Sequence, residues 1–300
     1  MINQDVVDKL LAPERIEATR TLLRHDFKKF ILFFHFVLTK KEFTFKPFHN
    51  QIIKELQDIV FGKAEKQHIV INMAPRYGKS IICQYLSSWG YSIIKDCNDI
   101  YTSYSDNLVL NFSDKIKAVI ETLEYKKLFK REISKSESGK RNWTIEGGGS
   151  FYACSVGGSI TGFGAGLSSD IFGGFLIIDD SIKPEDAKSE VMRNKAISYF
   201  QETLMNRLNN PKKTPIIIIA QRLHQDDICG FVERNYKDDF KILKIPALNE
   251  DTNQVIWEEK HTAEDLQKIK KLNPFYFYSQ YQQEPIVAGG TILIKEWFKY

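Results

Sequence analysis

The stretch that decides the fold is INMAPRYGKSIICQYL, residues 71–86. It begins as an apolar run typical of a buried strand, turns at Pro75 and Gly78, and continues from Ser80 with helical apolar spacing. In a strand, a short loop and a helix arranged in this order, free backbone amides and the helix dipole can face a phosphate group. The stretch therefore predicts a phosphate-binding loop, with a solvated lysine on an ordinary turn as the alternative.

The match to the phosphate-loop pattern G-x-x-x-x-G-K-[ST] is incomplete, because Met73 stands where the first glycine would be. A bare G-K-[ST] arises by chance in about one in ten chains of this length, so the strand and helix around it carry the argument. We expect Lys79 to neutralise β- and γ-phosphate oxygens and Ser80 to ligate Mg²⁺. Arg76 is either an arginine finger that reaches the γ-phosphate or a salt-bridge or interface residue.

A second motif, FLIIDD at residues 175–180, places two acids at the end of a buried strand. We expect Asp179 to hold Mg²⁺, directly or through water, and Asp180 to orient or deprotonate the attacking water. Adjacent carboxylates repel each other, which favours a cation beside them over a pair of helix-capping loop acids. Glu185 is an alternative base, or only a first-turn acid of the next helix.

A third motif, AQRLHQDD at residues 220–227, follows an isoleucine-rich strand. Gln221 and Arg222 are expected to emerge near the γ-phosphate, where either could sense its presence. One histidine and two acids at the start of a helix are more often caps than metal ligands, and Asp226 is the expected cap.

Apolar strands alternate with helices along the chain, which predicts an α/β fold with a mainly parallel sheet covered by helices on both faces. Ligands of such sheets bind beyond the carboxyl ends of the strands, where all three motifs fall. We predict a helical N-terminal segment over residues 1–40, a phosphate-loop domain over 41–285 and a short joint over 286–300. Long helices are expected at 107–129 and 184–208, and a glycine-rich hairpin within 142–166.

Composition sets outer limits on function. The net charge is only +4, from 42 Lys and Arg against 38 Asp and Glu, so any nucleic-acid surface has to be local. The four cysteines stand far apart, which indicates reduced, mostly buried thiols in a cytosolic protein. The N-terminus is too polar for a secretory signal, and the longest apolar run, 30–38, is far shorter than the ~20 residues of a membrane helix.

With these motifs, the chain resembles the large subunit of tailed-phage terminases, the motors that pack DNA into procapsids. The stretches that carry the resemblance run in order from residue 45 to residue 298: FKPFHNQIIKEL, INMAPRYGKS, YTSYSDNLVLNFSDKIK, GGSITGFGAG, LIIDDSIKPEDAKSEVMRN, AQRLHQDDICGFV and YSQYQQEPIVAGGTILIKEWF.

The resemblance implies a RecA-like (ASCE) P-loop ATPase fold that uses ATP and Mg²⁺ and translocates duplex DNA. It also implies a small terminase subunit, a portal ring and a homo-oligomeric ring as partners, in the cytoplasm of an infected or lysogenic bacterium. By the same resemblance Phe48, His49 and Gln51 contact the nucleotide base, although Phe48 alone would also suit a core and the other two a surface or a cap. The residues assigned to the phosphate loop are Pro75, Arg76, Tyr77, Gly78, Lys79 and Ser80.

Two departures from the family qualify the resemblance. The second acid is Asp180 where many phosphate-loop motors carry Glu, which leaves Glu185 open as the base. Family members continue into a nuclease domain with clustered acids, and residues 286–300 hold no such cluster, so we expect no DNA cleavage from this portion. Other RecA-like DNA-dependent ATPases or helicases, and a truncated inactive prophage remnant, remain as alternatives.

A basic stretch between residues 126 and 141 is a candidate DNA surface, and a solvated charged face explains it equally well. Its members are Lys126, Lys127, Lys130, Arg131, Lys135, Lys140 and Arg141.

Overall fold

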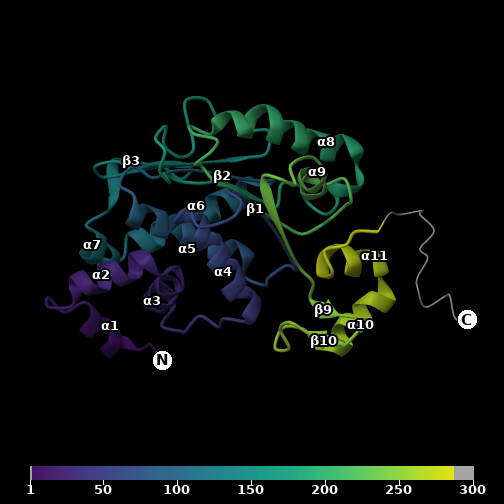
Figure 1. Cartoon of the computed structure of the whole chain (residues 1–300), viewed down its shortest axis with the longest axis horizontal. Coiled ribbons are helices and arrows are strands. Elements are labelled where there is room, and N and C mark those ends of the chain that lie inside the picture. Colours follow the sequence, from purple (N-terminus) through teal and green to yellow (C-terminus); the bar gives the residue numbers. More distant parts are fainter. Residues whose placement is uncertain (1, 287–300) are drawn as a thin grey trace, which may run out of the picture.

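The computed structural model describes residues 2–286, and within them a mixed sheet of eight strands forms the centre of the molecule (Figure 1). The strands follow the spatial order β3-β4-β5-β2-β6-β7-β1-β8. Their bounds are β1 His68–Met73, β2 Asn98–Ser103, β3 Ile133–Ser138, β4 Asn142–Ile145, β5 Ser150–Ser155, β6 Leu176–Asp179, β7 Ile216–Ala220 and β8 Phe240–Ile245.

All strands from β5 to β8 in this order pair in parallel, and the β3-β4-β5 edge is antiparallel. The predicted glycine-rich hairpin is confirmed as β4 and β5, while β3 was not predicted because its sequence, ISKSES, is mostly polar and exposed. Strand β1 lies between β7 and β8, and β6 lies between β2 and β7. The three motif-bearing strands β1, β6 and β7 are therefore neighbours.

Helices cover both faces of the sheet, as the sequence predicted. On β1, Ile69 and Ile71 belong to one core cluster, and Val70 between them belongs to the other. The first cluster includes side chains of α3 (Phe27–Thr39), α4 (Pro47–Val60), α5 (Lys79–Ile93) and α6 (Asp106–Ile120). The second includes residues around α8 (Glu190–Ser198) and α9 (Ile228–Asn235), which lie on the opposite side of the sheet in Figure 1. The central strands β1, β6 and β7 are mostly apolar because they are buried on both sides.

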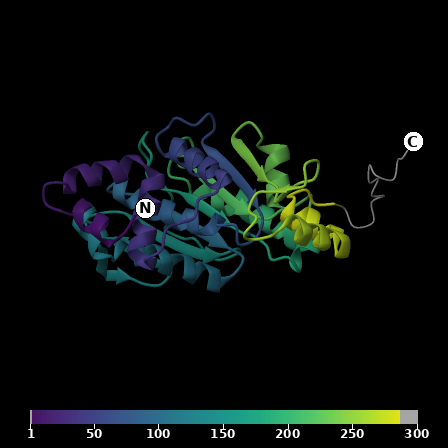
Figure 2. The same cartoon turned by 90° about the horizontal axis from the view of Figure 1, so that it is seen from below.

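The N-terminal helices share the core of the first face. Helices α1 (Gln4–Leu10) and α2 (Ile16–His25) precede α3, and Phe30 and Phe34 of α3 are fully buried beside Tyr125. The prediction of a helical N-terminus is confirmed. Figure 2 shows these helices at one end of the molecule and the C-terminal elements at the other.

Two long predicted helices are interrupted. The helix expected over 107–129 ends at Ile120, and Thr122 then caps α7 (Leu123–Phe129) by accepting a hydrogen bond from the Tyr125 amide. The helix expected over 184–208 contains the 3₁₀ turn Asp186–Lys188, α8, the π-helical turn Tyr199–Leu204 and the 3₁₀ turn Met205–Arg207. The sequence did not reveal these interruptions, because the apolar residues keep their helical spacing across both of them. Only the backbone hydrogen bonding changes there.

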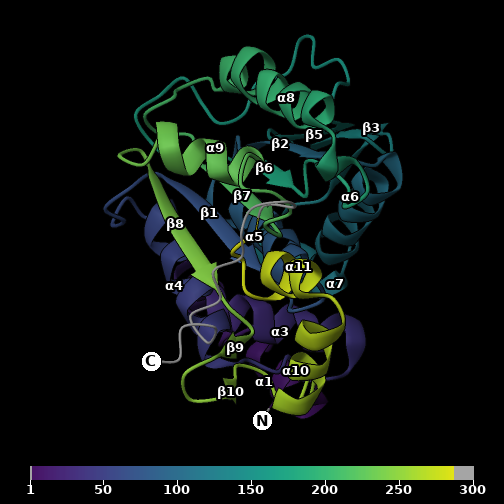
Figure 3. The ribbon, with the colours of Figure 1, turned by 90° about the vertical axis from the view of Figure 1, so that its right-hand side faces the viewer.

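After β8 the chain forms a small cap near the carboxyl ends of the central strands (Figure 3). It contains β9 (Leu248–Asn249), β10 (Gln254–Val255), α10 (Ala263–Leu272), α11 (Pro274–Tyr276) and the π turn Phe277–Tyr281. The Ala247 amide donates to the Tyr281 carbonyl at 2.8 Å, which joins the end of the cap to its beginning. The joint predicted over 286–300 lies, apart from its first residue, outside the described residues.

Two expectations from composition can be compared with the structure. All four cysteines are free and buried, as predicted. Within residues 2–286 no helix is both long enough and apolar enough to cross a membrane.

Candidate functional site

The predicted phosphate loop connects the end of β1 to the start of α5. Gly78 is the N-cap of α5 with φ +93°, and a Cβ at this position would lie 3.0 Å from His49 Nε2. Both the left-handed backbone and the close contact require glycine here. Lys79 is the first residue of α5, so the loop delivers its side chain to the carboxyl edge of the sheet.

Lys79 reaches across the sheet edge to the acidic strand end. Its Nζ lies 2.9 Å from Asp180 Oδ1, and the Lys79 side chain is only 6% exposed. The same carboxylate oxygen accepts a hydrogen bond from the backbone amide of Gln221 at 3.3 Å. Asp180 adopts φ +41°, a left-handed conformation that Asp and Asn tolerate better than most residues. The structure therefore brings residues of all three motifs into one contact, as their positions after parallel strands predicted.

Asp179 is the buried member of the acid pair, at 5% exposure. The Tyr101 hydroxyl donates to its Oδ2 at 3.1 Å, and its Oδ1 has no hydrogen-bond partner within residues 2–286. Burial and, secondarily, the charge of Asp180 raise the pKa of Asp179 to about 7, with Lys79 and the Ser80 hydroxyl offsetting part of the rise. A partnerless buried carboxylate oxygen beside a serine hydroxyl is a natural place for a cation.

These residues fit Mg²⁺ in the way nucleotide enzymes hold it. Among the described residues, no cluster of three or more His, Cys, Asp and Glu side chains could hold a metal alone. Mg²⁺ is commonly bound by one or two carboxylates together with substrate phosphates and water. Asp179 and Ser80 would supply the protein ligands, and phosphate oxygens would supply others.

Two adjoining clefts open at this edge. The first, of about 350 Å³, surrounds the phosphate loop. It is lined by Pro75, Arg76, Gly78, Lys79, Ser80, Ile81, Asp180 and Gln221. The second, of about 530 Å³, shares Pro75, Arg76, Asp180 and Gln221 with the first and extends to the C-terminal cap. Both volumes are in the range typical of small-molecule sites.

Tyr77 and His49 support the loop from behind and line neither cleft. Tyr77 is fully buried, and burial raises its pKa to about 12. His49 is also fully buried, and burial lowers its pKa, so the ring is neutral near pH 7. Its Nδ1 accepts from the Lys46 amide at 3.0 Å, which leaves Nε2–H to donate to the Tyr77 carbonyl at 2.8 Å. His49 thus holds the loop backbone in place.

The other residues of the predicted base-contact segment also lie away from the clefts. Phe48 is buried against His49 and Trp257, and Gln51 is exposed on α4. Neither lines either cleft. A contact between this segment and the base stays a prediction that the cleft geometry does not support.

Arg76 and Glu185 differ in their relation to the clefts. Arg76 is exposed, lines both clefts and has φ +64°, a backbone conformation unusual for arginine. Glu185 is exposed and lines neither cleft, although its neighbour Pro184 lines the larger one. Of the two acids proposed as base, Asp180 is the one at the cleft.

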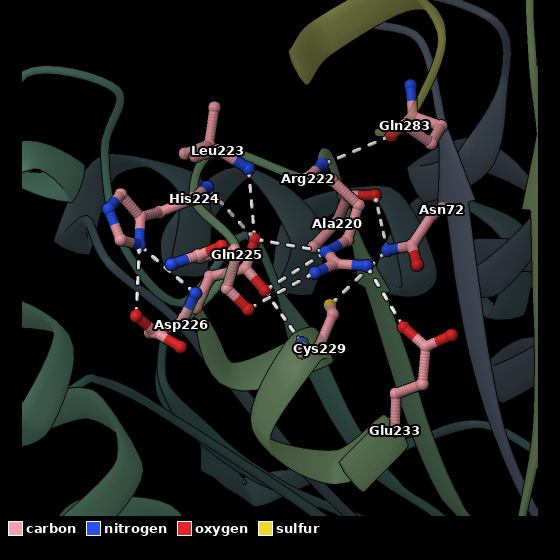
Figure 4. Close-up of polar contacts among 12 residues, drawn as sticks. Asn72, Ala220, Arg222, Leu223, His224, Gln225, Asp226, Cys229, Glu233 and Gln283 are labelled. Atoms are coloured by element: carbon pink, nitrogen blue, oxygen red, sulfur yellow. Dashed lines mark hydrogen bonds and ion pairs between the residues drawn. The ribbon is translucent and has the colours of Figure 1, made fainter. Parts of the chain in front are cut away.

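Arg222 is held in a buried ion network beside the site (Figure 4). Its Nε lies 3.1 Å from Asp227 Oδ1, and its Nη1 lies 3.2 Å from Glu233 Oε2. Its backbone amide donates to Gln283 Oε1 at 3.1 Å. Gln221, in contrast, lines both clefts, and its buried side-chain Oε1 has no hydrogen-bond partner in the described part of the chain. Of the two predicted sensors, Gln221 lies at the cleft, whereas the Arg222 side chain is buried in its ion network.

The expected helix cap in the third motif is wrong by one residue. Asp227, not Asp226, is the N-cap of α9, and its Oδ1 accepts from the Gly230 amide at 2.8 Å. Asp226 instead pairs with Arg234 at 2.9 Å. Because two acids stand side by side at this position, the sequence alone does not show which of them caps the helix.

Several cleft residues were not found by sequence reasoning. Tyr104, just beyond the end of β2, lines the larger cleft, and Tyr101 within β2 donates to Asp179 behind it. The cap contributes Lys260, His261, Tyr276, Gln280 and Tyr281 to the larger cleft. The aromatic run PFYFYSQYQQ, residues 274–283, was the available signal, but only the fold shows which of its rings face the cleft.

Solved structures with a similar fold are phage large terminases. The bacteriophage HK97 large terminase aligns with a TM-score of 0.56 and 14% identity over 87% of this chain, which spans 55% of the HK97 chain. An ATPase-domain variant of the Thermus phage P74-26 large terminase aligns with a TM-score of 0.46 and 12% identity, over 84% of this chain and 97% of that one. Neither a protein-family model nor a curated protein matches the sequence. At these identities the HK97 likeness confirms the predicted fold class, and activity has to be argued from the site.

Proposed function

We propose that this chain is the ATPase motor portion of a tailed-phage large terminase, coupling ATP hydrolysis to packaging of duplex DNA. One observation carries the proposal: Lys79 and Asp180 form an ion pair in a cleft, next to Asp179, whose Oδ1 has no partner among the described residues, in a chain with the large-terminase fold. Lysine, serine and paired acids at the carboxyl ends of parallel strands are the parts that phosphoryl transfer requires.

Each residue has a separate task in this scheme. The loop amides at the start of α5 and Lys79 bind the β- and γ-phosphates, for which Lys79 leaves its ion pair with Asp180. Asp179 and Ser80 hold Mg²⁺, which when bound neutralises phosphate charge. Asp180, released from Lys79, orients the attacking water and accepts its proton.

Arg76 and Gln221 lie where they can respond to the γ-phosphate. Arg76 is exposed at both clefts and serves as an arginine finger that stabilises charge in the transition state. Gln221 lines both clefts, its backbone amide donates to Asp180, and its side-chain oxygen has no hydrogen-bond partner within residues 2–286, so it serves as sensor. Glu185 serves as base only if it moves, since it lines neither cleft.

The partners proposed with this function are duplex DNA, the small terminase subunit, the portal ring and further copies of this chain, in the cytoplasm of a bacterium carrying the phage or prophage. In the basic stretch, Arg141 pairs with Asp106 at 2.8 Å and Lys126 with Glu132 at 3.8 Å, while Lys127 and Lys135 are exposed. The exposed members are available to DNA phosphates, and binding through them would weaken steeply with salt.

Steady-state ATP hydrolysis tests the proposal, comparing wild type with Lys79→Ala and Asp180→Asn, with and without Mg²⁺ and DNA. We expect Mg²⁺-dependent turnover that both substitutions abolish; asparagine suits the left-handed backbone at residue 180. Loss only in Lys79→Ala would transfer the base to Glu185. Wild type that neither binds nor hydrolyses ATP would contradict the proposal and favour an inactive remnant, and strand separation of duplex DNA would favour a helicase.

A further inference from the structure

A buried tyrosine of the neighbouring strand holds one oxygen of Asp179. Tyr101 lies in β2, which pairs in parallel with β6, and Ser103 of β2 is the register partner of Asp179. Because alternate residues of a strand share a face, Tyr101 points to the same side of the sheet as Asp179. The Tyr101 hydroxyl donates to Asp179 Oδ2 at 3.1 Å, and the two residues are 1% and 5% exposed. Water therefore has little access to this contact.

The Tyr101 ring is itself fixed by packing. Phe112 of α6 stacks on it, with ring centroids 3.8 Å apart and planes 13° apart. Phe112 stacks in turn on Phe151 of β5 at 6.4 Å. A ring clamped in this way presents its hydroxyl at one place, and Asp179 cannot turn its Oδ2 away without giving up a buried hydrogen bond.

The other oxygen of Asp179 is left for a ligand. Among the described residues Oδ1 has no hydrogen-bond partner, and a buried carboxylate oxygen without one is costly. Lys79 and Ser80 of the phosphate loop are close enough to act on the pKa of this carboxyl. Tyr101 thus divides the carboxylate into one oxygen that the protein holds and one that is free for the Mg²⁺ of the proposed function.

Mg²⁺ and Ca²⁺ place different demands on such a carboxylate. Mg²⁺ requires a near-ideal octahedral arrangement and is usually held by one or two carboxylates together with phosphates and water. Ca²⁺ takes more oxygen ligands in a flexible arrangement, and a carboxylate can give it both of its oxygens. A carboxylate that is fixed with only one free oxygen suits the first ion and withholds a ligand from the second.

We infer that Tyr101 is a positioning residue that fixes Asp179 for contact with Mg²⁺ through one oxygen and thereby selects Mg²⁺ over Ca²⁺. The inference rests on the proposed function, whose metal site it deepens. A phenylalanine would fill the same space against Phe112, so the hydroxyl is the part of Tyr101 that packing does not explain.

Calorimetric titration of the full chain with AMP-PNP, a slowly hydrolysed ATP analogue, tests this role in Mg²⁺, in Ca²⁺ and in EDTA. The affinity in EDTA reports the phosphate loop alone, and the gain on adding an ion reports the metal site. Tyr101→Phe should weaken AMP-PNP binding by about 10- to 100-fold in Mg²⁺ and leave the affinity in EDTA unchanged. Because Ca²⁺ can use the released second oxygen, the preference for Mg²⁺ over Ca²⁺ should fall by about tenfold.

Two further variants accompany this one. Tyr125→Phe is the matched control, because Tyr125 is also fully buried, its hydroxyl donates to the Ser88 carbonyl at 2.8 Å, and it lines neither cleft. It should bind AMP-PNP as wild type does in all three conditions. Phe112→Leu keeps the Tyr101 hydroxyl but loosens the ring, so it should cause a smaller loss that is confined to the titrations with metal.

The possible results separate the inference from the function on which it rests. Unchanged affinity of Tyr101→Phe in Mg²⁺, or an equal loss in Mg²⁺ and in EDTA, would overturn the positioning role and leave the phosphate site intact. An equal loss in Mg²⁺ and in Ca²⁺ would overturn the ion selection. If Tyr101→Phe does not fold, wild-type affinity of Phe112→Leu in Mg²⁺ would overturn the inference. Wild type that does not bind AMP-PNP, or binds it equally with and without Mg²⁺, would overturn the proposed function itself.

Discussion

Asp179→Asn should make the ligand-free protein more stable while removing a ligand of the proposed Mg²⁺ site. The pKa of Asp179 rises from its usual 3.8 to about 7, because the carboxyl is buried and lies beside Asp180. The folded pKa lies above the unfolded one, so this group's stability contribution is complete below pH 4 and is lost as the pH rises through 7. At pH 8 the wild type carries a charge whose burial costs up to about 4 kcal/mol. Asparagine keeps the oxygen that Tyr101 binds and removes that charge.

Urea unfolding in EDTA measures the effect. We expect Asp179→Asn to raise the free energy of unfolding by up to about 4 kcal/mol at pH 8 and by about 2 kcal/mol at pH 5, since the wild-type group is mostly protonated in the folded state there. Mg²⁺-dependent nucleotide binding should disappear. Asp99→Asn is the control, because Asp99 is equally buried with a pKa near 7 and does not line either cleft. Nucleotide binding should survive that substitution.

The reasoning about Asp179 would be refuted by either of two results. One is a variant less stable than wild type at pH 8, which would mean that the carboxylate is stabilised by contacts other than those described. The other is an increase in the free energy of unfolding that is the same at pH 5 and at pH 8, which would mean that ionisation of Asp179 does not cause it.

Two further substitutions test the supports around the cleft. His49→Ala removes the hydrogen bond to the Tyr77 carbonyl and should lower the free energy of unfolding by about 1–3 kcal/mol and weaken nucleotide binding. Gln51→Ala on the same helix should do neither. If the two variants behaved alike in urea unfolding and nucleotide titrations, the supporting role of His49 would be contradicted. Arg222→Ala breaks a buried ion pair and should cost about 3–5 kcal/mol in urea unfolding, whereas Arg234→Ala, which removes an exposed pair, should cost less than about 1 kcal/mol. Similar losses from both arginines would show that burial does not decide the energy of these pairs.

The parts of the site that could be predicted are those whose residues lie close to one another in the sequence. The strand-loop-helix at 68–93 and the acids after β6 are short patterns whose chemistry is set by neighbouring residues. Because β1, β6 and β7 were recognised as buried parallel strands, their carboxyl ends could be expected to meet, and the 2.9 Å Lys79–Asp180 contact confirms this. Breaks such as the one at Thr122 escaped prediction, because they leave the apolar spacing intact.

The roles of residues on one motif could not be separated without the fold. Tyr77 and Arg76 are adjacent, yet one ring is buried in an aromatic cluster and the other side chain is exposed at both clefts. Gln221 and Arg222 diverge in the same way: Gln221 lines both clefts, whereas Arg222 is buried away from them. Arg222 then finds Asp227 and Glu233, and the pairing removes it from the cleft.

The sequence by itself determined the α/β class, the strand-loop-helix around Lys79 and the acid pair, because these depend on apolar periodicity and on residues within a few positions of one another. Only the tertiary structure decided that His49 supports the loop from behind and that a cap from residues 246–286 closes the cleft with Tyr276 and Gln280. Those contacts join segments up to about two hundred residues apart, and no local pattern records which side chains such packing leaves free for a ligand.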